Sequence, residues 1–188
     1  MAAAGLAGYI GWLLWGTGLT TTAALHRLGQ VGQQVIDTAI GQAPPPGYQP
    51  LPNSFYAQLI IPRIDLNMSV VEGTEYANLE NGPGHYPDTA DPWSNTGRVG
   101  IAGHRTTYLH PFFHLDQMQV GDPITLRTKY GDFTYRVTRV FTLPTAISGQ
   151  VLTQTVQPTL VLTTCNPAYS ATERLIVTAD KVSGPSTP

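Results

Sequence analysis

Short strand-forming runs separated by turn dipeptides constrain the fold of this chain more than any other feature of its sequence. β-Branched and aromatic residues are concentrated in residues 56–61, 68–71, 99–102, 124–128, 133–138, 159–164 and 175–179. Turn dipeptides such as Asn81-Gly82, Gly121-Asp122 and Gly131-Asp132 separate these runs. Seven or more strands within about 135 residues are what a closed or nearly closed β-barrel needs. The sequence therefore predicts an all-β fold.

The composition agrees with one folded domain that contains little helix. The chain has 188 residues, 41% of them apolar, which is enough for a single sizeable core. Charged residues make up only 12%, below the roughly 25% of an average soluble domain, and 19 Gly and 16 Pro indicate many turns. Within the domain we predict only short helices, at residues 77–81 and 111–117.

The first 25 residues contain no charged side chain and include five Leu and two Trp, although five Gly and four Thr dilute their apolar character. A segment of this length can cross a bilayer, which needs about 20 apolar residues, so we predict a transmembrane anchor. A cleaved signal peptide is the alternative, because Thr22-Ala23-Ala24 offers small residues around a cleavage point. No Lys or Arg precedes the segment to decide between the two or to fix its orientation.

Residues 26–47 are predicted to connect the anchor to the folded domain. Leu28, Val31, Val35 and Ile36 recur at helical spacing, which predicts a stalk helix. Three consecutive prolines at 44–46 and a glycine at 47 then favour an extended linker. The predicted organisation is thus an anchor at 1–25, a stalk and linker at 26–47, a folded domain at 48–182 and a tail at 183–188.

The charge distribution argues against nucleic acid and metal ligands. The formal net charge is −2 and the chain has no basic run, so the electrostatic footprint of phosphate-backbone binding is missing. The acidic residues of the first half of the domain are scattered without the spacing of a calcium loop, and we interpret them as solvated turn residues. They are Asp65, Glu72, Glu75, Glu80, Asp88, Asp91 and Asp116. We expect neither a metal nor a cofactor.

The single cysteine, Cys165, rules out an intramolecular disulfide. A lone cysteine is often a small buried hydrophobic residue. This one, however, ends the buried-type run at residues 160–165 and is followed by Asn166-Pro167. A thiol at the end of a strand can face a groove while its backbone stays rigid, as a nucleophile requires.

Two other polar residues stand at comparable strand ends. His104 closes the run at 99–104, and Arg174 opens the strand that follows Cys165. Each of them, taken alone, is more often a structural residue. If the three strand ends meet, a thiol, an imidazole and a guanidinium converge. The imidazolium would stabilise the thiolate and protonate a leaving amine, and the guanidinium would stabilise the oxyanion of a tetrahedral intermediate.

The remaining histidines lack such a context. We interpret His26 as a surface residue of the stalk, and His85, His110 and His114 as loop residues. His110 lies six residues after His104 and is the substitute candidate for the base.

Several motifs in order resemble the sortase family, and in particular its class E branch from actinobacteria. The motifs are Ala102-Gly-His-Arg-Thr-Thr, Pro111-Phe-Phe, Leu162-Thr-Thr-Cys-Asn-Pro and Arg174-Leu-Ile-Val. The resemblance implies an eight-stranded sortase β-barrel with Cys165 as nucleophile, His104 as general acid and base, and Arg174 holding the oxyanion or positioning the substrate. Residues near these three are then expected to bind substrate: Ala102, Gly103, Thr106, Tyr108, Thr163 and Thr164.

Two departures from the family pattern concern the surroundings of the site. Val161 stands where the family's TLxTC motif usually has threonine, which removes a hydroxyl but keeps the shape of the side chain. Leu109 and His110 stand where small residues are expected, which affects the shape of the substrate groove.

The resemblance also implies the reaction. A surface protein with a C-terminal sorting signal of the LPxTG or LAxTG kind would be cleaved between Thr and Gly, forming a thioester at Cys165. An amine of a cell-wall precursor or a pilin lysine would then resolve it, with the catalytic domain held outside the cell membrane by a single-pass anchor. Two alternatives stay open: a cysteine peptidase that hydrolyses the same acyl-enzyme, and a non-catalytic β-barrel surface module.

Overall fold

A computed structural model describes residues 8–9, 11–12, 17–39, 44–45 and 47–185. In these residues eight strands close into a barrel in the order β1-β2-β3-β4-β7-β8-β6-β5. The strands are β1 (Phe55–Ile61), β2 (Leu66–Glu72), β3 (Gly84–His85), β4 (Arg98–Ala102), β5 (Pro123–Thr128), β6 (Gly131–Pro144), β7 (Thr159–Asn166) and β8 (Glu173–Ser183). The predicted all-β barrel is confirmed.

All seven predicted strands are present, but the structure differs from the prediction in the length of β6 and in the additional strand β3. The strand predicted at 133–138 is the start of β6, which runs on to Pro144 because it pairs with β8 over its whole length. β3 was not predicted because two residues are too few to show an alternating pattern. It nevertheless closes the barrel, pairing parallel with β2 and antiparallel with β4.

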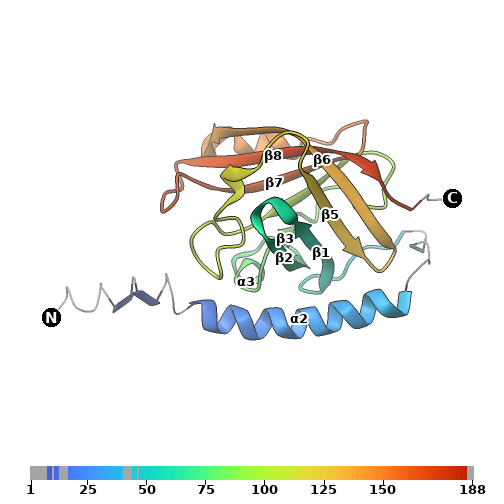
Figure 1. The fold of residues 1–188 in the computed structure, drawn as a ribbon, viewed down its shortest axis with the longest axis horizontal. Helices are drawn as coiled ribbons and strands as arrows, with labels where there is room; N and C mark the ends of the chain where they lie inside the picture. Colours follow the sequence, from blue (N-terminus) through green and yellow to red (C-terminus); the bar gives the residue numbers. More distant parts are fainter. Residues whose placement is uncertain (1–7, 10, 13–16, 40–43, 46, 186–188) are drawn as a thin grey trace.

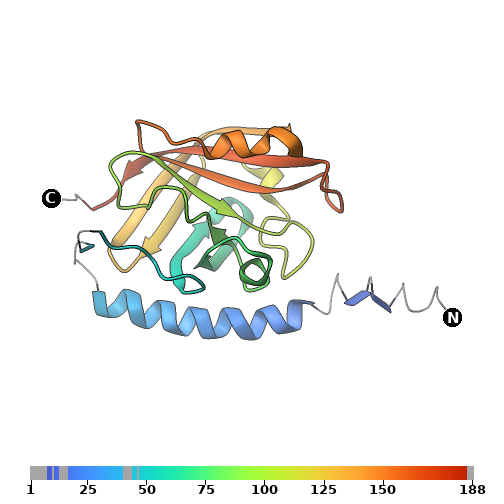
Figure 2. The same ribbon diagram turned by 180° about the vertical axis from the view of Figure 1, so that it is seen from behind.

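The helices within the domain are short, as predicted. The segment predicted at 77–81 overlaps α3 (Tyr76–Leu79), and the segment predicted at 111–117 contains the 3-10 helix η3 (Leu115–Gln117). Two further 3-10 helices were not predicted: η2 (Pro62–Ile64) between β1 and β2, and η4 (Thr145–Leu152) between β6 and β7. η4 packs over β6 and β8 on the side of the barrel away from the N-terminal helix (Figure 2).

The core lies inside the barrel and comes from alternate residues of the strands. In β5 the buried positions are 124, 126 and 128, and in β1 the side chains of Leu59 and Ile61 are fully buried. Burying one such side chain contributes about 1.5–3 kcal/mol to folding. The largest fully buried side chains are Tyr135, Phe112, Phe133, Leu59, Ile61, Ile101, Leu115, Ile124, Leu126, Leu160, Leu162 and Ile176.

One long helix, α2 (Thr17–Ala39), precedes the barrel and lies along it next to β1 and β2 (Figure 1). Ile36 is buried in this contact, and Gly32 faces the ring of Phe55. Of the stalk helix predicted in residues 26–40, residues 26–39 lie in α2, which rests on the barrel, and residue 40 lies outside the described residues. The domain boundaries remain predictions.

The predicted anchor falls partly outside the described residues, at 1–7, 10 and 13–16. Of the helices that the structure describes, none is both long and apolar enough to cross a membrane. The anchor, the alternative signal peptide and the hydrophobic N-terminal helix therefore stay predictions. Residues 186–188 of the predicted tail also lie outside the described residues.

Candidate active site

The parallel pairing of β4 with β7 brings His104 and Cys165 to the same end of the barrel. Ala102 is the register partner of Thr163. The pairing continues past the strand, because Gly103 N–H donates to the Thr163 carbonyl at 3.1 Å and the Thr164 hydroxyl donates to the Gly103 carbonyl at 2.8 Å. Since parallel strands end at the same edge, His104 leaves β4 where β7 reaches Cys165.

Arg174 joins this edge from β8. It is the cross-strand partner of Cys165 in the antiparallel β7–β8 pair. Its Nη1 donates to Thr145 Oγ1 at 3.2 Å and to the carbonyls of Ala171 and Glu173 at 3.3 and 3.1 Å. Nε and Nη2 make no hydrogen bond to the part of the chain that the structure describes, so these donors are available to another group. Cys165 itself is half-buried, unlike a cysteine of the core.

His104 sits in a partly apolar environment. Its Nε2 atom is buried and has no hydrogen-bond partner among the described residues. Burial lowers the pKa of His104, and the nearby carboxylate of Glu80 opposes this by raising it. The imidazole therefore has an unused polar atom at the edge where Cys165 lies, and its protonation depends on one acidic neighbour.

The loop after His104 folds back on it. Phe112 N–H donates to the His104 carbonyl at 3.1 Å, and the fully buried ring of Phe112 lies against Gly103. A Cβ at Gly103 would come within 2.6 Å of that ring, so only glycine allows this approach.

The same loop contains a left-handed turn built from non-glycine residues. The φ angles of Tyr108, Leu109 and His110 are 49°, 62° and 40°. L-residues in this region cost roughly 1–2 kcal/mol each. This explains why small residues are expected at Leu109 and His110, because glycine adopts positive φ without that cost. The turn directs the Tyr108 side chain inward, where it is buried.

Arg105 was not singled out from the sequence, although it follows His104 directly. Its buried guanidinium donates through Nη1 to the carbonyl of Cys165 at 3.4 Å and to Asn166 Oδ1 at 2.5 Å, and its Nη2 lies 3.2 Å from a carboxylate oxygen of Asp116. Asn166 in turn donates to Glu173 at 2.9 Å. Arg105 thus ties the segment of His104 to the end of β7.

The sequence matches a known family over most of the barrel. Residues 59–182 match the family described as the sortase domain. The chain belongs to the sortase family. The match begins within β1 and ends in β8, so it includes β4, β7 and the three residues at their common edge.

The relatives include sortases of classes E and D. Sortase SrtE1 of Streptomyces coelicolor is 28% identical over 183 residues, covering 90% of this chain and 51% of that protein. Sortase D of Bacillus subtilis is 34% identical over 127 residues, covering 66% of this chain and 62% of that protein. The chain therefore spans between about half and three-fifths of the length of these relatives.

Solved sortase structures share the fold. A sortase D5 transpeptidase of Clostridium perfringens superposes with a TM-score of 0.69 at 25% identity, covering 86% of this chain and 98% of that one. Sortase E1 of Streptomyces coelicolor, solved with a tripeptide in its active site, gives 0.65 at 29% identity, covering 72% and 92%. The predicted resemblance to the sortase family and its class E members is thus confirmed.

The residues predicted to bind substrate in this sortase domain have the following positions. Ala102 is buried at the end of β4, and Thr106 is half-buried in the loop after His104. The hydroxyl of Thr163 is within 3.1 Å of the Tyr86 hydroxyl. Gly103 and Thr164 are hydrogen-bonded in the pairing of β4 with β7, and the Tyr108 hydroxyl donates to Glu80. These residues lie at the end of β4, in β7 and in the loop after His104, and their contact with substrate stays a prediction.

The interpretation of His85 as a loop residue and of Glu72 as a solvated turn residue was wrong. Both are buried in strands, and His85 Nδ1 lies 2.8 Å from Glu72 Oε2. The ring of Tyr56 stacks on His85 at 4.0 Å and donates its hydroxyl proton to Asp91 at 2.9 Å, so Asp91 is not a free turn residue either. The pattern could not show this because β3 is too short to be recognised.

The other histidines and acidic residues give no second site. His110 and His114 are exposed, as expected of loop residues. Within the described part of the chain no three His, Cys, Asp or Glu side chains cluster closely enough to hold a metal ion.

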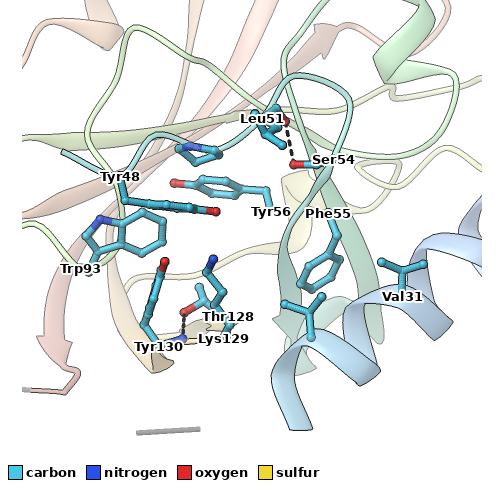
Figure 3. Close-up of a pocket in the computed structure, with 12 residues that line it drawn as sticks. Val31, Tyr48, Leu51, Ser54, Phe55, Tyr56, Trp93, Thr128, Lys129 and Tyr130 are labelled. Atoms are coloured by element: carbon cyan, nitrogen blue, oxygen red, sulfur yellow. Dashed lines mark hydrogen bonds between the residues drawn. The ribbon is translucent and has the colours of Figure 1, made fainter. Parts of the chain in front are cut away.

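A cavity of about 300 Å³ lies elsewhere on this sortase domain, between α2 and the barrel (Figure 3). Its walls include Val31 of α2, Phe55 at the start of β1, and Tyr130 in the turn between β5 and β6. Tyr48 and Trp93 form an aromatic wall beside Tyr130. None of Cys165, His104 and Arg174 lines this cavity.

Proposed function

We propose that this chain is a cysteine transpeptidase that cleaves a sorting signal and transfers the acyl part to an amine. The observation that carries the proposal is the strand register. It brings the ends of β4 and β7 together and pairs Arg174 with Cys165 across β7 and β8. Membership of the sortase family supports the same three residues in the same roles.

The chemistry follows from the three side chains. The Cys165 thiolate attacks the carbonyl carbon of the scissile peptide bond, while the Arg174 guanidinium offers its free donors to the developing oxyanion. His104, as imidazolium, gives its proton to the leaving amine, and a thioester to Cys165 remains. The incoming amine then attacks the thioester, His104 takes up its proton, and the Cys165 thiolate leaves.

The peptide substrate is proposed to carry a C-terminal LPxTG-like or LAxTG-like signal, cleaved between Thr and Gly. The tripeptide in the active site of Sortase E1 of Streptomyces coelicolor supports a peptide ligand for this kind of site. The acceptor is proposed to be an amine of a cell-wall precursor or of a pilin lysine. In that case the catalytic domain works outside the cell membrane.

The test is an amine-dependence experiment on the full chain. A quenched sorting-signal peptide is incubated with and without a millimolar primary amine, and products are followed by fluorescence and mass spectrometry. We expect a ligated product whose yield rises with amine concentration and which is absent for Cys165→Ala. Cleavage with no ligated product at any amine concentration would show a hydrolase instead. No cleavage and no labelling of Cys165 by a thiol reagent would show a non-catalytic module.

A further inference from the structure

Three side chains beside His104 are joined by hydrogen bonds. The Tyr108 hydroxyl donates to Glu80 Oε1 at 2.7 Å, and the Tyr76 and Tyr108 hydroxyls are 2.8 Å apart. Burial and these two hydrogen bonds raise the pKa of Tyr108 well above its usual value, so its hydroxyl keeps its proton. Because that proton goes to Glu80, Tyr76 must donate to Tyr108. The bonds therefore run in one direction, from Tyr76 through Tyr108 to the carboxylate of Glu80.

The two tyrosine rings are the neighbours of the imidazole. The centroid of the Tyr108 ring lies 5.0 Å from that of His104, and the Tyr76 ring meets His104 edge-on at 6.3 Å. The two tyrosine rings are themselves perpendicular, with centroids 6.0 Å apart. His104 is thus held against a corner formed by two aromatic rings, and Glu80 fixes that corner through the Tyr108 hydroxyl.

The backbone around Tyr108 is strained, and contacts around the loop hold it in this conformation. Tyr108, Leu109 and His110 all have positive φ, which costs free energy for L-residues. The loop is closed by hydrogen bonds from His110 N–H to the Thr107 carbonyl at 2.8 Å and from Phe112 N–H to the His104 carbonyl at 3.1 Å. Strain of this kind persists where the surroundings over-determine a side chain, here the ring of Tyr108 against His104.

We propose that Tyr76, Tyr108 and Glu80 form a positioning unit for His104, in which the two rings fix the plane of the imidazole and the Glu80 carboxylate holds the rings in place through the Tyr108 hydroxyl. The unit rests on the proposed transpeptidase function, because it prepares His104 to protonate a leaving amine. Tyr108 then acts through His104 and does not touch the sorting signal, in contrast to its predicted role in substrate binding.

The charges around His104 determine the direction in which its pKa moves when Glu80 is replaced. Glu80 is the acidic group that raises the pKa of His104 against the lowering by burial. The other ionisable groups of this edge include the thiol of Cys165, the guanidinium groups of Arg105 and Arg174, and the carboxylates of Asp116 and Glu173. Arg105 is hydrogen-bonded to Asn166 at the end of β7 and paired with Asp116. Removing the charge of Glu80 leaves burial unopposed, so the pKa of His104 falls. His104 then loses its proton at lower pH.

Two variants test the unit, each with a matched control. Tyr108→Phe keeps the ring and removes the hydroxyl, and Tyr130→Phe makes the same change at a buried hydroxyl that has no hydrogen-bond partner among the described residues. Glu80→Gln removes the charge, and Glu75→Gln removes an exposed charge at the start of α3. The titration of the His104 imidazole is followed by NMR in the full chain, with the resonance assigned by its loss in His104→Gln.

For Tyr108→Phe and Glu80→Gln we expect kcat to fall about tenfold with KM changed by less than about twofold, and the His104 titration to move to lower pH. Both controls should match the wild type in all three quantities. A rise in KM without a fall in kcat would place Tyr108 in the substrate site and overturn the proposal. An unmoved His104 titration in both variants would overturn it as well.

The imidazole titration needs no substrate, so it decides on the positioning unit even if the chain transfers nothing to an amine. If Tyr108→Phe does not fold, Tyr76→Phe removes a hydroxyl from an exposed residue of the same unit, and a smaller shift in the same direction is expected. Failure of transfer with a shifted titration would reject the proposed function alone. Transfer with an unmoved titration would reject the positioning unit alone.

Discussion

Arg105 should hold the segment of Cys165 in place, and Arg105→Met tests this. Methionine keeps the length and the apolar stem of the side chain but has no donors. The substitution removes the bonds from Nη1 to Asn166 Oδ1 at 2.5 Å and to the Cys165 carbonyl at 3.4 Å, and the ion pair with Asp116 at 3.2 Å.

The expected magnitude follows from these contacts. The short bond from a charged, buried donor to Asn166 contributes roughly 1.5–3 kcal/mol. The long bond to the Cys165 carbonyl adds little, and the pair with Asp116, whose side chain is 56% exposed, adds at most about 1 kcal/mol. Arg105 Nε is buried without a partner in the described residues, and its removal offsets part of the loss. We expect a net destabilisation of about 2 kcal/mol.

The assay combines urea unfolding with kcat for peptide transfer. Freeing the end of β7 moves Cys165, and a displacement of about 1 Å is enough to lower kcat by ten- to a hundredfold. Asp116→Asn is the control, because it removes only the exposed ion pair and should change the free energy of unfolding by less than about 0.5 kcal/mol. If Arg105→Met matches the wild type in stability and kcat, strand pairing alone fixes Cys165 and the reasoning is refuted.

Three further substitutions probe the barrel and the site. Glu72→Ala leaves the buried Nδ1 of His85 without its hydrogen-bond partner and should lower the free energy of unfolding by about 1–3 kcal/mol, measured by urea unfolding. Gly103→Ala places a methyl group against Phe112 and should cost about 1–3 kcal/mol and lower kcat, because the loop after His104 must shift. Burial lowers the pKa of His104, so the unfolded chain binds its proton more readily. The stability of the wild type should therefore fall relative to His104→Gln as the pH drops from about 7 to 5.

Each of these has a control on the same chain. Glu75→Ala removes an exposed carboxylate, and Gly149→Ala adds a methyl group where no atom lies within 4 Å. Both should stay within about 0.5 kcal/mol of the wild type. His26→Gln, at an exposed position of α2, should not alter the pH dependence of stability. Equal effects in a variant and its control would show that the named contact is not responsible.

The barrel could be predicted because its strands carry their own pattern. The run at 159–164 consists only of Thr, Leu and Val, and the structure buries it between β4 and β8. The turn dipeptide Gly121-Asp122 directly precedes β5, and Gly131-Asp132 begins β6. β3 was not predicted because its two residues are held by pairing with β2 and β4, which no local sequence pattern reports. η4 was not predicted because its eight residues include Gly149 and show no amphipathic spacing.

The candidate site, like the barrel, could be predicted from the sequence only in part. Cys165, His104 and Arg174 could be chosen because each stands at the end of a recognisable strand. Glu80 could not, since its link to the site passes through the Tyr108 hydroxyl across 28 residues of sequence. The inward direction of Tyr108 depends on a left-handed turn that its residue types do not favour. The sequence pattern therefore does not report contacts across the barrel or strain in the backbone.

A search for an acyl-enzyme of the full chain gives the most direct test of the central claim. The protein is mixed with a sorting-signal peptide, quenched in acid and measured by intact-mass and peptide mass spectrometry. We predict an adduct with the mass of the acyl fragment, located on Cys165, that disappears on addition of a primary amine as the ligated peptide forms. Ligation that persists in Cys165→Ala, or an adduct on another residue, would contradict the account.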